Sequence, residues 1–165
     1  MKDSDIKQTL RQFEKVWPRV TAREEAPPSP PPKEGAAAAL AEFIGAETAA
    51  EQRCLCMAQR SGGGNADALR RLAAGSRRLA RKLQAEYYLL TGDSLPVPRR
   101  GQAKCRPFGE ALRLAWLSAG RAEHAYRAAI GRTDDDTLRE LFREAAELKQ
   151  SQRALLRDLA GRLMR

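Results

Sequence analysis

Three interruptions of an otherwise helical pattern constrain the fold of this chain more than any other feature. The segments Ser61-Gly62-Gly63-Gly64-Asn65 and Gly131-Arg132-Thr133 are short, whereas the stretch from Asp93 to Arg106 is longer and contains two prolines and a glycine. Glycine and proline interrupt helices because glycine loses more backbone freedom and proline lacks an N–H donor. The sequence therefore predicts four helical segments joined by a short, a long and a short connection.

Each of the four segments carries apolar side chains at the three- and four-residue spacing of a helix that buries one face. We expect helices over residues 36–60, 66–91 and 107–130, and a fourth from about residue 134 to near the C-terminus. The expected buried positions are Leu40, Phe43, Ile44, Glu47, Cys54 and Met57 in the first helix, Leu69, Leu72, Leu79, Leu83 and Tyr87 in the second, and Leu138, Leu141, Phe142, Leu148, Leu155, Leu156, Leu159 and Leu163 in the fourth.

The composition and the residues at the segment ends agree with this helical interpretation. Ala, Leu and Arg dominate the chain, and these residues lose little side-chain freedom in a helix. Pro107 suits the first turn of the third helix, and Gly92 suits the end of the second. Thr133 or Asp134 is expected to cap the fourth helix.

The first 35 residues form a separate part of the chain. Apolar residues recur at helical spacing within residues 1–20, and Pro18 would end that short helix. A run of five prolines and one serine then follows between Ala26 and Lys33, which is typical of an extended linker. We therefore predict a flexible N-terminal extension over residues 1–35 and a single helical domain over residues 36–165.

The chain is basic, with 30 Lys+Arg against 21 Asp+Glu and a formal net charge of +9. Such a balance suits nucleic acid, an anionic surface or an acidic partner. Acidic residues alternate with the basic ones along most helices, so solvated helix faces are the favoured interpretation. Binding of nucleic acid through Arg70-Arg71, Arg77-Arg78 and Arg99-Arg100 stays open as an alternative. No apolar run reaches membrane-spanning length, so no membrane partner is expected.

Three cysteines, Cys54, Cys56 and Cys105, give no even set for a disulfide framework. On a helix the sulfurs of Cys54 and Cys56 point to different faces. Cys54 is predicted to be an apolar core residue, and Cys105, in a basic stretch, is the better candidate for a reactive thiol. A chain without a disulfide scaffold or a signal-peptide pattern is expected in the reducing cytoplasm.

Several sequence phrases resemble the ferritin-like superfamily, specifically the rubrerythrin-type four-helix bundles of bacteria. They are Phe43-Ile44-Gly45-Ala46-Glu47, the run from Arg81 to Gly92, Ala122-Glu123-His124-Ala125-Tyr126 and Leu138-Arg139-Glu140-Leu141-Phe142. The resemblance covers residues 38–164. It implies an all-α, ferritin-like four-helix bundle with an up-down-down-up order of helices and a long crossover between the second and third helices.

The resemblance also implies where a di-iron site would lie. In these bundles two helices each supply one Glu and the other two each supply a Glu-x-x-His pair, whose spacing places both side chains on one face. In chain order the six ligand positions fall at Glu47, Ser76, Leu79, Ala119, Lys149 and Gln152. Only the first of them is a metal-ligating residue, so the resemblance implies a degenerate metal site.

A single carboxylate cannot hold two irons, and a lysine beside it opposes a cation. We therefore expect no cofactor and a non-catalytic binding or structural module instead of an enzyme. Buried Glu47 needs a partner, and an ion pair with Lys149 is the preferred hypothesis; the alternative has Lys149 reaching solvent. Ser76, Gln152 and Tyr126 are expected to form a hydrogen-bonded core network, with a small-molecule pocket as the less favoured alternative.

A second functional hypothesis is an iron-dependent redox protein of the rubrerythrin type with non-standard ligands. Glu47 would then bind metal with help from Glu123, Glu147 or His124, the only histidine of the chain. His124 is expected at the surface or as a satisfied core residue. A homodimer and an unidentified protein partner both stay open.

Overall fold

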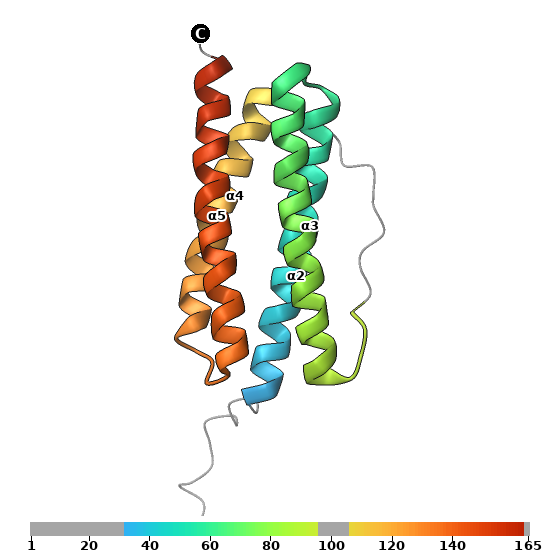
Figure 1. Cartoon of the computed structure of the whole chain (residues 1–165), viewed down its shortest axis with the longest axis vertical. Coiled ribbons are helices and arrows are strands. Elements are labelled where there is room, and N and C mark those ends of the chain that lie inside the picture. The colour runs from blue at the N-terminus through green and yellow to red at the C-terminus, as the bar shows by residue number, and fades with distance from the viewer. Residues whose placement is uncertain (1–31, 96–105, 164–165) are drawn as a thin grey trace, which may run out of the picture. The chain divides into compact units, whose positions relative to one another are not determined.

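The computed structural model describes residues 32–95 and 106–163, shown as coloured ribbon in Figure 1. The predicted N-terminal helix and residues 26–31 of the proline-rich linker lie outside the described residues, and so do Cys105 and the arginine pair Arg99-Arg100. Residues 32–35, predicted to belong to the flexible extension, are helical instead.

Helices account for all the regular secondary structure of the described residues. They are α2 (Pro32–Gln59), α3 (Gly63–Thr91), α4 (Phe108–Ile130) and α5 (Asp136–Leu163). Within residues 32–95 and 106–163, the prediction of an all-α fold with four helices is confirmed. Helices α2 and α3 begin a few residues earlier than the sequence pattern suggested, which is the usual uncertainty of helix ends.

The end of α3 matches its prediction. Gly92 follows the last helical residue with a φ of 77° and donates its N–H to the carbonyl of Tyr88 at 2.8 Å. This left-handed conformation favours glycine because a Cβ would be strained there. A tight glycine turn therefore ends the helix where the sequence predicted.

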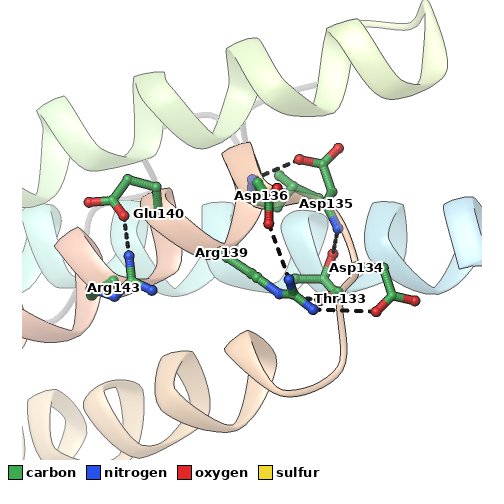
Figure 2. A network of polar contacts seen from close by, with 8 residues as sticks. Thr133, Asp134, Asp135, Asp136, Arg139, Glu140 and Arg143 are labelled. Atoms are coloured by element: carbon green, nitrogen blue, oxygen red, sulfur yellow. Dashed lines mark hydrogen bonds and ion pairs between the residues drawn. The ribbon is translucent and has the colours of Figure 1, made fainter.

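The prediction that Thr133 or Asp134 caps the fourth helix is wrong, because Asp135 does so. Asp135 directly precedes the first helical residue, and its Oδ1 accepts the N–H of Leu138 at 3.0 Å. The Thr133 hydroxyl instead accepts the N–H of Asp135 at 3.3 Å. Figure 2 shows this turn and its ion pairs, Arg139 with Asp136 at 3.1 Å, Arg139 with Asp134 at 3.4 Å, and Arg143 with Glu140.

Two apolar clusters fill the interior, and each takes side chains from all four helices, so α2–α5 form a four-helix bundle. The first cluster includes Phe43, which stacks on Tyr126 with ring centroids 4.2 Å apart and meets Phe142 edge-on at 5.5 Å. The second includes Leu69 of α3 and Leu159 of α5, both almost fully buried. Burial of this apolar surface is the main stabilising contribution to the bundle.

Most positions predicted to be buried are buried, with exceptions in α3 and α5. Tyr87, Leu148 and Leu155 are half-buried, and the side chain of Leu163 lies outside the described residues. In α5 the inward positions near the middle of the helix are taken by Lys149 and Gln152. Leu148 precedes the buried Lys149 and is only half-buried, because successive residues of a helix point about 100° apart.

Candidate functional site

A layer of polar side chains separates the two apolar clusters at the middle of the bundle. It consists of Glu47 from α2, Ser76 from α3, Tyr126 from α4, and Lys149 and Gln152 from α5. Their relative exposures are 1%, 1%, 0%, 1% and 7%. Each of the four helices thus contributes a polar group to one buried layer. Such a layer destabilises the fold unless every polar group has a hydrogen-bond partner.

An ion pair between Glu47 and Lys149 forms the centre of the layer. Lys149 Nζ contacts Glu47 Oε2, and the two side chains are 2% and 1% exposed. The same ammonium donates to Gln152 Oε1 at 3.0 Å and to Ser76 Oγ at 3.3 Å. All three donors of the ammonium therefore have acceptors. The predicted pair is confirmed, and the alternative in which Lys149 reaches solvent is wrong.

Tyr126 is the second hydrogen-bond partner of the buried Glu47 carboxylate. Its hydroxyl donates to Glu47 Oε1 at 3.0 Å, so both carboxylate oxygens accept hydrogen bonds. Burial raises the pKa of Tyr126 well above its ordinary value, and the charge of Glu47 and the hydrogen bond to it raise it further. The phenol therefore keeps its proton and acts as a fixed donor.

Gln152 closes the layer against α3 in a place where the backbone leaves little room. Its Nε2 lies 3.4 Å from the carbonyl of Leu72 and 3.5 Å from Ser76 Oγ. A Cβ added at Gly75 would lie 3.1 Å from that same nitrogen. Glycine at position 75 therefore permits the close approach of α3 and α5.

A cavity of about 30 Å³ adjoins the layer, and Glu47, Ser76, Ala119, Lys149 and Gln152 all contribute to its lining. A cavity of this volume holds about two water molecules. It is far smaller than the roughly 300 Å³ or more of a ligand pocket. The observations favour a hydrogen-bonded network here and not a small-molecule pocket.

The positions carried over from the family resemblance converge on this cavity, with one exception. Ala119, at 8% exposure, lines it and offers no donor atom. Leu79 is also buried but belongs to the first apolar cluster. Five of the six ligand positions therefore meet at one place.

This set of side chains does not fit a di-iron group. Its only carboxylate is Glu47, whose two oxygens are engaged by an ammonium and a phenol. A lysine ammonium repels a cation, and two irons require several anionic ligands. Among residues 32–95 and 106–163, no three His, Cys, Asp or Glu side chains gather in a way that would hold a metal ion.

The ligands considered for the alternative iron site are not brought together around Glu47. Glu147 and His124 are exposed. Glu123 pairs with Arg127 at 2.9 Å and with Arg153 at 3.2 Å. The surface position predicted for His124 is confirmed.

The two cysteines of α2 differ in environment. Cys54 is buried and free, and burial raises its pKa to about 11, which confirms it as an apolar core residue. Cys56 is half-buried and disulfide-bonded. No disulfide framework was expected from the sequence, and the disulfide of Cys56 departs from that expectation. The two-residue spacing turns this sulfur to a different face of the helix from that of Cys54.

Two of the three tandem arginine pairs lie on α3. Arg70 pairs with Asp67 at 2.8 Å, and Arg77 lies 3.9 Å from Glu51. One member of each pair is thus directed to an acid of this chain. Nucleic-acid binding through these pairs stays a prediction.

No helix within the described ranges is both long and apolar enough to cross a lipid bilayer. The chain matches no known family model, no curated protein and no solved structure.

Proposed function

We propose that this chain is a ferritin-like bundle of the rubrerythrin type in which a buried ion pair replaces the di-iron site, and that it works as a non-catalytic binding or structural module. The observation that carries this proposal is the contact between the Lys149 ammonium and the Glu47 carboxylate. The ammonium supplies positive charge at a position where the family would place a ligand to a metal cation. Ser76 and Gln152 then satisfy the remaining donors of the ammonium.

The arrangement of the helices supports the ferritin-like part of the proposal. In Figure 1, α2 and α5 run upward while α3 and α4 run downward, and these directions support an up-down-down-up order. Contacts join α2 to α4 through Glu47 and Tyr126, and α3 to α5 through Lys82 and Glu144, whose charged atoms lie 2.5 Å apart. A long connection between the second and third helices produces this order.

The geometry of the polar layer supports the non-catalytic part. Each functional group of the layer is hydrogen-bonded within the core, and Tyr126 is held protonated. The adjoining cavity has room for about two water molecules and none for an organic substrate. Binding or assembly is therefore left to the outer faces of the bundle.

The first test is elemental analysis of the purified, untagged full chain after growth with added iron and manganese. We expect less than about a tenth of a metal ion per chain, because folding does not require a metal in this core. One or two iron atoms per chain would overturn the proposal.

A ligand-restored variant tests the correspondence with the family. We would combine the substitutions S76E, L79H, A119E, K149E and Q152H, and K149E alone would serve as the matched control. If the positions correspond, the fivefold variant gains iron and a metal-dependent rise in melting temperature, while the single variant does not. A folded fivefold variant that takes up no iron would contradict the family assignment. The Glu47–Lys149 pair would then not be explained as the replacement of a di-iron site.

A further inference from the structure

A groove on the outer face of the bundle, which we call the α4–α5 groove, lies apart from the polar layer. It has a volume of about 440 Å³ and runs between Gly109, Leu112 and Trp116 of α4 and Leu156 and Ala160 of α5. Leu112 and Leu156 are 3% exposed, so they form its inner surface, while the half-buried Trp116 forms part of the wall. The groove is therefore apolar along its base.

Two arginines, Arg113 from α4 and Arg157 from α5, also line the α4–α5 groove. Both are exposed, and neither makes a hydrogen bond or ion pair with another described residue. No Asp or Glu lines the groove. By contrast, Arg139 and Arg143 of the same helix α5 both pair with acids. Two cations thus converge on an apolar groove that has no acid to neutralise them.

Arginine side chains also lie beyond Trp116, although one of them, Arg153, is paired with Glu123 at 3.2 Å. The Trp116 ring also borders a second hollow of about 360 Å³, to which Arg121 and Arg153 contribute. The Arg153 guanidinium lies over the Trp116 ring, 4.7 Å from its centroid. Gly120 makes room for it, since a Cβ there would lie 3.2 Å from Arg153 Cζ. Trp116 therefore separates two hollows that are both lined by arginine and not by acids.

We propose that the α4–α5 groove binds an amphipathic anion, namely a molecule with an apolar chain and a carboxylate, phosphate or sulfate head group. The chain lies against Leu112, Leu156 and Trp116, where removal of apolar surface from water drives binding. The head group meets the guanidinium groups of Arg113 and Arg157 and accepts charge-assisted hydrogen bonds from them. This inference does not depend on whether the Glu47–Lys149 pair replaces a di-iron site. Either proposal can therefore fail without the other.

The dimensions of the groove favour a small amphiphile over a macromolecule. Its volume lies within the range of about 300–1,000 Å³ that holds small ligands. Gly109 and Trp116 are seven residues apart on α4, which corresponds to about 10 Å of helix. A medium-length alkyl chain matches this distance, so decanoate is the probe that we would use.

Tryptophan fluorescence of the full chain measures the binding directly. A W17F background leaves Trp116 as the only tryptophan, since the chain contains two. Decanoate below its micellar concentration should change the Trp116 emission saturably. Decyltrimethylammonium has the same chain and the opposite charge, and we expect it to bind at least about tenfold more weakly.

Two variants with matched controls locate the site. R113E/R157E should weaken decanoate binding at least about tenfold. The control R71E/R78E changes the net charge by the same amount at exposed arginines of α3 outside the groove. It should change decanoate binding by less than about twofold. G109L fills the groove with a side chain, and a Cβ at Gly109 meets no atom within 4 Å. G64L is the corresponding control in the first turn of α3, where a Cβ also meets nothing.

We expect R113E/R157E and G109L to remain folded by far-UV circular dichroism and to lose decanoate binding, while both controls retain it. Equal binding of decanoate and decyltrimethylammonium would overturn the proposal, because it would show an apolar surface without selection for charge. Binding that survives both groove variants would overturn it as well, because the amphiphile would then lie elsewhere. Absence of saturable binding to the parent protein would have the same meaning.

Discussion

Removing one partner of the Glu47–Lys149 pair should destabilise the bundle far more than loss of a surface ion pair. Both side chains are at most 2% exposed, so solvent does not screen the charge that is left. K149M retains the length of the side chain but leaves the Glu47 carboxylate buried with Tyr126 as its remaining partner. Breaking a buried pair in this way costs about 3–5 kcal/mol, against at most about 1 kcal/mol for an exposed pair.

The complementary variant and the double variant decide whether this cost belongs to the pair. E47Q leaves the Lys149 ammonium buried without a counter-charge and should also cost about 3–5 kcal/mol. In E47Q/K149M neither charge remains, and the carbonyl oxygen of the introduced amide can still accept the hydrogen bond from Tyr126. The double variant should therefore be less destabilised than the sum of the single variants by about 2 kcal/mol or more.

Urea unfolding followed by far-UV circular dichroism measures these free energies. A domain of this kind has a total stability of about 5–15 kcal/mol, so a single variant can lie near its unfolding limit. Recovery of folded protein in the double variant would still support the pairing. Single variants that each cost less than about 1 kcal/mol, or strictly additive effects, would refute the reasoning. K82M, which removes the exposed Lys82–Glu144 pair, is the surface control.

The core and the helix ends give three further predictions. The pKa of Tyr126 is raised in the folded state, so its contribution to stability is complete below about pH 10 and falls above it by about 1.4 kcal/mol per pH unit. Y126F should remove this part of the dependence of the unfolding free energy on pH, and an unchanged dependence would contradict the argument. Cys54, with a pKa of about 11, should resist iodoacetamide at about pH 8 in folded protein and react in urea, as read by peptide mass spectrometry. D135A should cost about 1 kcal/mol in thermal or urea unfolding, while T133A should cost less.

The helical pattern of the sequence predicted much of the fold because interruptions and apolar periodicity act locally. Gly92 is a clear example: a glycine after an apolar stripe has one strong structural meaning. The cap of α5 was harder, because four successive residues from Thr133 to Asp136 can all accept a hydrogen bond at a helix start. Only the position of the first helical residue selects Asp135 among them.

The Glu47–Lys149 pair was predicted because both residues interrupt apolar stripes at positions that the resemblance placed together. Tyr126 was predicted to join a hydrogen-bonded core network, but nothing in the sequence indicated that its hydroxyl donates to the Glu47 carboxylate. The α4–α5 groove was not predicted at all. It depends on which side chains two neighbouring helices leave uncovered, and this information does not lie in the periodicity of either helix alone. The disulfide of Cys56 was missed because an odd number of cysteines does not show which thiols the fold brings together.

The polar layer also fixes the longitudinal alignment of the helices. Most of the buried contacts of α5 are made by Leu, Ala and Phe, and such side chains tolerate exchange of one apolar neighbour for another. A displacement of α5 by one turn, about 5.4 Å, would separate Lys149 from Glu47 and leave both charges in apolar surroundings. The ion pair therefore raises the free energy of any packing in which α5 is shifted by one turn along α2. The polar layer thus specifies the alignment of the helices, which a purely apolar core would do less strictly.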